Sequence, residues 1–288
     1  MSSGAPTRPR VLTTAAEIFH AVEALRSAGQ TVGLVPTMGA LHAGHLSLVE
    51  AAGRDCDRTV VTIFVNPTQF GPGEDLARYP RDLEADLEVL AQTGVDLVFA
   101  PAAEEIYRPG HSTFVLPPDV AQPLEGRCRP GHFQGVATVV LKLLLLAPAH
   151  AAYFGEKDFQ QLLVMRRMVA DLNVPTAVRG CPIVRDADGL AMSSRNAYLT
   201  PAERQRALAI PRCLELAADR YRAGQRDSAA IAAGMRQVLA DAGLDRIDYV
   251  ALADAETLAE ATQLGPSSVA LVAAHVGATR LIDNRRLG

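Results

Sequence analysis

Two histidines, His42 and His45, stand three residues apart in the run Pro36-Thr-Met-Gly-Ala-Leu-His-Ala-Gly-His45, which follows a short apolar stretch at 31–35. A strand that turns through glycine into a helix presents N–H groups and positive potential at the helix start, where phosphate binds. The spacing places both imidazoles on one face of the first helical turn. The run therefore predicts a phosphate site. Two alternatives remain open: half-buried polar side chains, or a metal-binding pair, for which no Glu base or further ligand is evident nearby.

A second candidate is Gln69, in the run Asn66-Pro-Thr-Gln69-Phe70 after an apolar strand expected at 59–65. Open α/β sheets bind ligands at the carboxyl edge of their strands, where this run lies. The Gln69 amide both donates and accepts hydrogen bonds, which suits a hydroxy acid and its carboxylate. The alternative is a turn stabilised by Asn66, which accounts for Asn66 better than for Gln69.

Two further segments combine cations with polar neighbours. Gly155-Glu-Lys157-Asp158 places a cation and a carboxylate in a short turn before a helix, although such a pair is more often a solvated surface pair. Met192-Ser-Ser-Arg195 offers two hydroxyls and a guanidinium, which suit a polyphosphate. Its alternative is a polar linker or hinge between two domains.

The pattern of apolar residues predicts the elements that position these side chains. Buried strands are expected at 31–35, 59–65 and 95–99, and helices at 15–28, 42–52, 83–92, 135–146 and 160–172. Near-continuous apolar strands that alternate with helices indicate a parallel sheet covered on both faces. After residue 182 we expect helices at 201–221 and 228–242, then antiparallel strands at 247–252, 269–275 and 279–282. The prediction is an α/β fold, with a Rossmann-like parallel-sheet, nucleotide-binding domain over 1–183 and a smaller α+β domain over 184–288.

Composition excludes several classes of protein. The 288 residues are 49% hydrophobic and 21% charged, with a net charge of -4, so the chain is globular and has no basic footprint for nucleic acid or an anionic membrane. The longest apolar run, 136–147, is interrupted by Lys142 and is shorter than the roughly 20 residues of a spanning helix. Residues 1–10 lack an apolar segment and are expected to be a frayed tail. The four cysteines form no Cys-x-x-Cys pair, which favours reduced thiols in the cytoplasm.

Five ordered sequence blocks resemble a known family. His42-Ala-Gly-His45 after a strand resembles the H-x-G-H signature of the nucleotidyltransferase superfamily, which includes class I aminoacyl-tRNA synthetases. The longer run PTMGALHAGH resembles the pantoate–β-alanine ligase (pantothenate synthetase) family. So do FVNPTQFG, RPGHFQGV, FGEKDFQQ and GLAMSSRN, in the family's order and spacing. The similarity extends from about residue 12 to the C-terminus.

The resemblance assigns roles to individual residues. It implies an ATP-binding set made of Met38, Gly39, Ala40, Leu41, His42, Ala43, Gly44, His45, Gly155, Glu156, Lys157, Asp158, Val184, Met192, Ser193, Ser194 and Arg195. Val184 would line the adenine site through its backbone. Gln69 and Gln161 would bind pantoate, and Gln69 would also contact β-alanine. The expected catalytic groups are His45, the implied proton donor, with His42, Lys157 and Arg195.

The implied reaction has two steps. The pantoate carboxylate attacks the α-phosphorus of ATP, giving pantoyl adenylate and pyrophosphate, and the amine of β-alanine then displaces AMP. The carboxylate is already ionised at pH 7, so catalysis is expected to rest on positioning and on stabilisation of phosphate charge. Mg²⁺ is expected to bridge ATP oxygens, with protein ligands unknown. The resemblance further implies a homodimer. The competing functions are another H-x-G-H adenylyltransferase and a non-catalytic nucleotide-binding module.

Separate predictions concern residues outside these sets. Asp86 is either an acidic contributor to the site or part of a solvated helix face. The Gly71–Tyr79 loop is expected to be a lid over the acyl adenylate. Met38 and Val140 could pack against the methyl groups of pantoate, and Val140 could equally be plain core. No role is assigned to His132, and surface or satisfied core positions are expected for the histidines His20, His111, His150 and His275.

Overall fold

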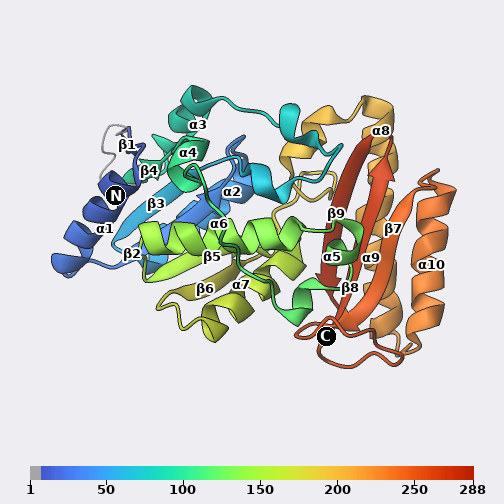
Figure 1. Cartoon of the computed structure of the whole chain (residues 1–288). Coiled ribbons are helices and arrows are strands. Elements are labelled where there is room, and N and C mark those ends of the chain that lie inside the picture. Colours follow the sequence, from blue (N-terminus) through green and yellow to red (C-terminus); the bar gives the residue numbers. More distant parts are fainter. Residues whose placement is uncertain (1–7) are drawn as a thin grey trace. The chain divides into compact units, whose positions relative to one another are not determined.

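The computed structural model describes residues 8–288 (Figure 1). The chain divides into two compact units. The first ends at Glu156 and resumes over Gln161–Pro182, and the second comprises Lys157–Gln160 and Ile183–Gly288. Residues 1–7 of the expected tail lie outside the described residues, and the tail prediction is wrong at Arg10, which begins a strand. The helices of residues 8–288 include none long and apolar enough to cross a membrane.

The first unit is built on a six-stranded sheet in which every pairing is parallel. Its strands are β1 (Arg10–Leu12), β2 (Val32–Thr37), β3 (Arg58–Ile63), β4 (Leu97–Phe99), β5 (Ala151–Gly155) and β6 (Ala177–Cys181). Its helices are α1 (Ala15–Ser27), α2 (Ala43–Asp55), α3 (Leu83–Leu90), α4 (Ala103–Ile106), α5 (Glu125–Cys128), α6 (His132–Leu146) and α7 (Phe159–Asp171), whose first two residues group with the second unit.

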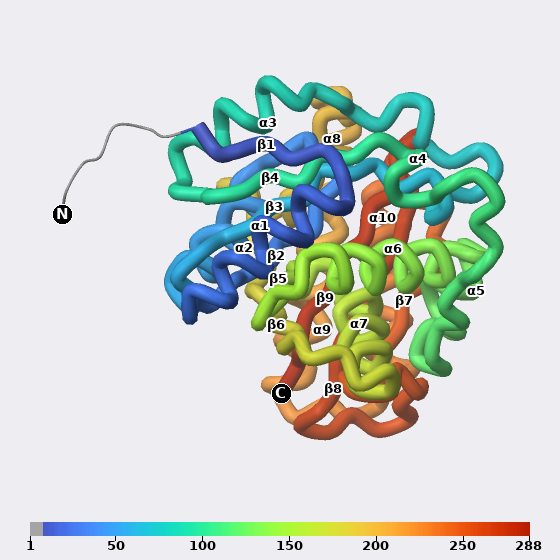
Figure 2. Tube along the Cα trace, turned by 60° about the vertical axis from the view of Figure 1, so that its left-hand side comes forward, coloured from blue at the N-terminus to red at the C-terminus, as the bar shows by residue number. Residues whose placement is uncertain are grey.

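Side chains of the central strands alternate between two apolar cores. On β2, Leu34 packs into a cluster with residues of α1, α6 and α7, whereas Val35 joins a second cluster with residues of α2 and α3. Figure 2 shows α1 and α6 as neighbours in the layer that covers the first of these faces. Both faces of the sheet are thus buried, as expected for a parallel sheet.

The strand order β1-β4-β3-β2-β5-β6 reverses direction at β2. From β2 the chain proceeds to β3 and β4 on one side, while β5 and β6 lie on the other. Such a reversal opens a crevice at the carboxyl ends of the two central strands, where α/β proteins bind ligands. The segments that leave β2 and β5 at this edge are Met38–His45 and Gly155–Glu156.

The second unit packs three helices with an antiparallel sheet of order β7-β8-β9. The strands are β7 (Ile247–Asp254), β8 (Ser268–Val276) and β9 (Thr279–Arg286), and the helices are α8 (Pro201–Ala207), α9 (Ala209–Arg222) and α10 (Ser228–Asp241). Alternate residues of β8, including Val272 and Val276, share one core cluster with α9 and α10. The prediction of a single helix over 201–221 is wrong, because the helix divides at Leu208. The division is explained by Pro211, which has no N–H to continue the helical hydrogen bonds.

The structure confirms the α/β class, the parallel sheet and the smaller α+β unit with antiparallel strands. Three strands were not predicted. β1 has only three residues, and β5 (AAYFG) and β6 (AVRGC) carry alanine and glycine in place of the β-branched residues that mark a strand. Pairing with β2 places the alanines of β5 in the sheet, so tertiary context decides their conformation.

A glycine allows α6 to lie against the short 3-10 helix Pro67–Gln69. A Cβ on Gly135 would stand 2.3 Å from the Thr68 carbonyl oxygen and 2.7 Å from the Gln69 nitrogen. We therefore expect Gly135→Ala to lower the free energy of unfolding by about 1–3 kcal/mol, the usual cost of overpacking. The matched control is Gly53→Ala in α2, where the nearest atom is 3.9 Å away and Ala should stabilise by about 0.5–1 kcal/mol. Urea unfolding of both variants measures the difference, and a stabilising Gly135→Ala would contradict the packing argument.

Candidate active site

The loop that follows β2 adopts a left-handed turn. Gly39 has φ +83° and Ala40 has φ +51°, a conformation that costs energy at an alanine. The carboxylate of Asp86, from α3, holds this turn by accepting the N–H of Ala40 at 3.0 Å and that of Leu41 at 2.8 Å. Asp86 is only 5% exposed, so the solvated-face interpretation is wrong for this residue.

The contact with Asp86 also explains why the turn needs glycine. A Cβ on Gly39 would lie 2.8 Å from Asp86 Oδ2. Burial raises the pKa of Asp86 above its ordinary value, and the N–H bonds from Leu41 and Ala40 oppose this rise. Burial of this side chain carries a cost in solvation, and its two hydrogen bonds secure the shape of the loop before α2.

The two histidines form a reciprocal cap at the start of α2. His42 is the N-cap residue, and its Nδ1 accepts the N–H of Gly44 at 3.1 Å. His45 lies in the first turn, and its Nδ1 accepts the N–H of His42 at 3.3 Å. Each neutral ring must then carry its proton on Nε2, because Nδ1 serves as an acceptor. The ring centroids are 4.1 Å apart, so the structure brings together two imidazoles whose donor N–H is on Nε2.

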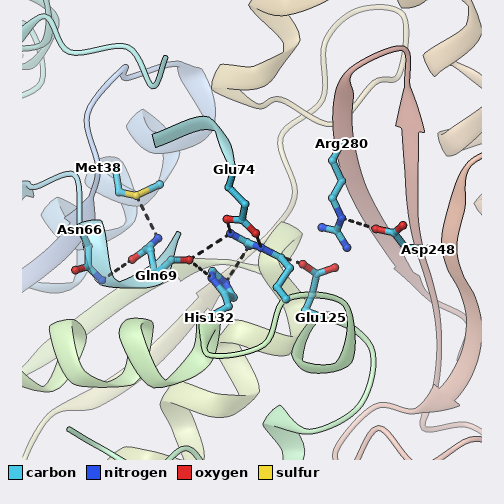
Figure 3. A network of polar contacts seen from close by, with 9 residues as sticks. Met38, Asn66, Gln69, Glu74, Glu125, His132, Asp248 and Arg280 are labelled. Atoms are coloured by element: carbon cyan, nitrogen blue, oxygen red, sulfur yellow. Dashed lines mark hydrogen bonds and ion pairs between the residues drawn. The ribbon is translucent and has the colours of Figure 1, made fainter. Parts of the chain in front are cut away.

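Both the oxygen and the nitrogen of the Gln69 side-chain amide are hydrogen-bonded within the first unit. Its Oε1 accepts from Asn66 Nδ2 at 2.9 Å, and its Nε2 donates to Met38 Sδ at 3.2 Å (Figure 3). Asn66 is buried and also bonds Thr68 and the Gly135 carbonyl, which confirms the expected role of Asn66 in the turn. The contact with Met38 brings Gln69 to the loop after β2.

A buried histidine that sequence reasoning left without a role supports Gln69. His132 Nδ1 lies 2.9 Å from the Gln69 carbonyl, and Nε2 lies 3.1 Å from an Arg129 nitrogen. A carbonyl and a guanidinium fix the neutral tautomer, with the proton on Nδ1. Burial and the Arg129 charge lower the pKa of His132 to about 4. Since the unfolded chain takes up this proton near pH 6.5, acidification from that pH toward 4 favours unfolding.

In the second unit, Lys157 precedes α7 in a short 3-10 turn. Its Nζ is 4.0 Å from Asp158 Oδ1, and its side chain is 20% exposed, which is more buried than the expected surface pair. Its carbonyl accepts from Asn284 Nδ2 at 3.0 Å, and the Arg286 guanidinium lies 5.0 Å from the Phe159 ring centre. These contacts explain why residues 157–160 group with the second unit.

A small hairpin presents the segment Met192–Arg195. Arg185 pairs with Ala191 as an isolated bridge, and its guanidinium bonds both oxygens of the buried Asp283 at 2.7 and 3.0 Å. After the hairpin, Ser193 Oγ accepts the N–H of Arg195 at 3.2 Å and caps the 3-10 helix Ser194–Tyr198. The segment is therefore ordered by local bonds and is not an extended linker.

The remaining predicted residues have defined places. The Val184 carbonyl accepts the Met192 N–H at 3.0 Å, which uses one of its two lone pairs. Gln161 lies in the first turn of α7, in the first unit, and Val140 is buried in the core with α6. His150 is exposed, which agrees with the surface expectation, and its Nδ1 accepts the Val32 N–H. His275 does not meet the satisfied-core expectation, because its buried Nδ1 has no hydrogen-bond partner within the described residues.

No group of three or more His, Cys, Asp or Glu side chains within residues 8–288 could hold a metal ion. Asp86 is the carboxylate at the loop after β2, and both its oxygens already accept N–H groups. The donors around this loop are thus suited to phosphate rather than to a cation.

Comparison with known proteins gives a consistent result. A family model described as pantoate-beta-alanine ligase matches residues 10–286. Pantothenate synthetase from Roseiflexus sp. (strain RS-1) is 54% identical over 275 residues, which cover 96% of this chain and 98% of that protein. Pantothenate synthetase from Moorella thermoacetica is 51% identical over 274 residues, covering 95% and 97%.

Solved structures agree in fold. Pantothenate synthetase from Thermus thermophilus superposes with a TM-score of 0.90 at 47% identity, covering 96% of this chain and 99% of that one. Pantoate-beta-alanine ligase from Francisella tularensis, complexed with beta-gamma ATP and beta-alanine, gives a TM-score of 0.80 at 33% identity, covering 97% and 98%. Matches of this extent favour neither another H-x-G-H adenylyltransferase nor a non-catalytic module. The chain belongs to the pantoate–β-alanine ligase family.

Proposed function

We propose that the chain joins pantoate to β-alanine through a pantoyl adenylate formed at the loop after β2. The activity is that of the family: the chain is an ATP-dependent ligase that forms the amide bond of pantothenate and releases AMP and pyrophosphate. The observation that carries the site assignment is the reciprocal cap of His42 and His45. It fixes both rings with Nε2–H as the donor, at a helix N-terminus where negative charge is favoured.

In the first step, a carboxylate oxygen of pantoate attacks the α-phosphorus of ATP, and the bond to pyrophosphate breaks. We assign His42 and His45 to the charge that grows on the transferring phosphate and the departing pyrophosphate, with His45 as proton donor. Lys157, Ser193, Ser194 and Arg195 are assigned to the same polyphosphate from the second unit. In the second step, the β-alanine amine attacks the acyl carbon and AMP leaves.

The acids are assigned to the first unit. Gln69 is proposed to hold pantoate and β-alanine, and Gln161 to hold pantoate. Support for Gln69 comes from its fixed amide, which is bonded at both ends and lies beside the apolar Met38. The rest of the proposed ATP-binding set consists of Met38, Gly39, Ala40, Leu41, Ala43, Gly44, Gly155, Glu156, Asp158, Val184 and Met192.

Four further properties belong to the same proposal. Mg²⁺ would enter bound to ATP oxygens and water, because the described residues form no carboxylate cage. The second unit, with the boundary expected at 183/184, would close over ATP. The chain would act as a homodimer. A cytoplasmic location is supported by four free cysteines, two of them buried.

The order of the two steps gives the first test. Pantoate can be activated before any amine binds, so exchange of labelled pyrophosphate into ATP should require pantoate but not β-alanine. Incubation with all three substrates should yield AMP and pantothenate in equal amounts. Exchange that begins only after β-alanine is added would exclude the adenylate route.

The histidine pair allows the capping role to be separated from the catalytic role. In His45→Asn, the amide oxygen can replace Nδ1 as acceptor of the His42 N–H, but no donor remains at the position of Nε2. We expect the rate of adenylate formation to fall by about 10²–10³ while the unfolding temperature stays near that of the wild type. The double variant with His42→Asn should lose less than the sum of the two single losses in free energy, because both rings act on one transition state.

Single-turnover formation of pantoyl adenylate measures this effect. The control is His20→Asn on the exposed side of α1, which should leave the rate unchanged. If a folded His45→Asn enzyme formed the adenylate at the wild-type rate, the two histidines would have only a structural role as the cap of α2.

Asp86 is expected to affect ATP binding through the loop. In Asp86→Asn, the amide can accept from only one of the Ala40 and Leu41 N–H groups, so the loop loses one anchor. We expect the KM for ATP to rise about tenfold. The free energy of unfolding should change by less than about 1 kcal/mol, because removal of a buried charge offsets the lost acceptor.

The control lies on the same helix. Asp82 caps α3 by accepting the Ala85 N–H, and Asn caps equally well, so Asp82→Asn should alter neither quantity. Pyrophosphate-exchange kinetics and urea unfolding report the two effects separately. An unchanged KM for ATP in Asp86→Asn would show that the loop keeps its shape without this carboxylate.

A further inference from the structure

Arg129, just before α6, joins two parts of the first unit that carry different proposed roles. Its guanidinium bonds both oxygens of Glu74, with Nε to Oε1 at 2.7 Å and Nη2 to Oε2 at 2.6 Å. Glu74 belongs to the Gly71–Tyr79 loop, the expected lid. On its other side, Arg129 Nη1 lies 3.1 Å from His132 Nε2, and Nη2 lies 3.5 Å from the Gln69 carbonyl.

Hydrogen bonds through Arg129 and His132 connect the Gly71–Tyr79 loop to Gln69. Arg129 donates to the unprotonated Nε2 of His132, and His132 donates from its protonated Nδ1 to the same Gln69 carbonyl at 2.9 Å. The backbone of Gln69 is thus fixed by His132 and Arg129, while its side-chain amide is fixed by Asn66 and Met38. Any movement of the guanidinium changes the backbone contacts of Gln69.

The group is shielded from solvent, and its one guanidinium lies between two carboxylates. The side chain of Arg129 is 15% exposed, that of Glu74 is 25% exposed, and that of Glu125, 3.9 Å from Arg129, is 7% exposed. Burial opposes ionisation of Glu74, but the ion pair with Arg129 outweighs it and lowers the pKa of the carboxyl. A partly buried ion pair with bidentate geometry is stronger and more directional than a surface pair.

We propose that Arg129 is a positioning residue for both pantoate and β-alanine. Through its contacts, the position of the Gly71–Tyr79 loop determines the position of Gln69. When Glu74 is bound, the guanidinium is aligned on His132 and the Gln69 carbonyl, and the amide is ready for pantoate and β-alanine. When Glu74 leaves, the guanidinium is released and Gln69 loses a support. The inference rests on the proposed role of Gln69.

Arginine is required here because of its shape. The planar fork meets both oxygens of Glu74 while a further N–H points at His132, and one lysine ammonium cannot reproduce this set. Arg129→Lys keeps the charge but should lose the alignment. Glu74→Gln keeps the size of the loop side chain but removes its charge and one acceptor.

The experiment measures both variants in the full-length enzyme. We expect Glu74→Gln and Arg129→Lys each to raise the KM for pantoate and for β-alanine about tenfold, the change that loss of one charge-assisted hydrogen bond produces. The KM for ATP should stay within about twofold. The ratio of AMP to pantothenate should rise above one, because a detached loop exposes the acyl adenylate to water. The matched control is Glu23→Gln, in the exposed ion pair with Arg26 on α1, which should change none of these values.

A double-mutant cycle tests the coupling itself. If the loop acts through Arg129 on Gln69, Glu74→Gln combined with Gln69→Asn should raise the KM for pantoate by less than the product of the single effects. If the KM for pantoate in the double variant rose by the full product of the two single effects, the loop and Gln69 would act independently, and the proposal would be overturned. A folded Glu74→Gln enzyme with unchanged KM for both acids would overturn it as well. If Glu74→Gln and Arg129→Lys both lost ATP affinity and thermal stability in parallel, the ion pair would have only a structural role, which would also overturn the proposal.

The same set of variants separates this inference from the proposed function. If Gln69→Asn alone leaves the KM for both acids unchanged, the role of Gln69 is wrong. If Gln69→Asn raises both values but Glu74→Gln does not, the role of Gln69 stands and the positioning role of Arg129 is wrong.

Discussion

The carboxylate of Asp86 holds a backbone turn that would not persist alone. Two consecutive residues, Gly39 and Ala40, have positive φ, and the N–H groups of Ala40 and Leu41 turn back onto one buried side chain. The loop enters α2 at an angle that lets His42 act as N-cap and His45 close the cap. The direction of both rings therefore depends on an acidic residue from another helix, and burial of this residue raises the pKa of its carboxyl.

Three histidines of the first unit illustrate how the backbone assigns a tautomer. In His42 and His45, Nδ1 accepts a main-chain N–H, so the donor is Nε2. In His132 the order is reversed, since Nδ1 faces a carbonyl and Nε2 faces a guanidinium. The same side chain thus carries its donor N–H on Nε2 in two cases and on Nδ1 in the third. The difference lies in the partner on the protein side and not in the histidine.

Much of the fold was accessible from the sequence, because β2, β3 and the long helices carry strong periodic patterns. The ends of those elements placed His42, His45 and Gln69 correctly at the carboxyl edge of the sheet. Asp86 could not be distinguished from its neighbours Asp82, Glu84 and Glu88, since only tertiary packing buries one carboxylate of the four. The role of Arg129 was equally hidden, because its partners Glu74 and Gln69 lie 55 and 60 residues away. The alanine-rich β5 and the split at Leu208 depend on neighbours that local propensity does not describe.

The grouping of Lys157–Gln160 with the second unit has a consequence for biosynthesis. The chain enters this unit for four residues, returns to the first unit over Gln161–Pro182, and then enters it again. The carbonyl of Lys157 accepts from Asn284, which lies 127 positions later, and the ring of Phe159 meets Arg286. During translation the lysine therefore emerges long before the residues that fix its backbone. The hydrogen bond that fixes the backbone of this proposed phosphate ligand can form only after β9 has left the ribosome.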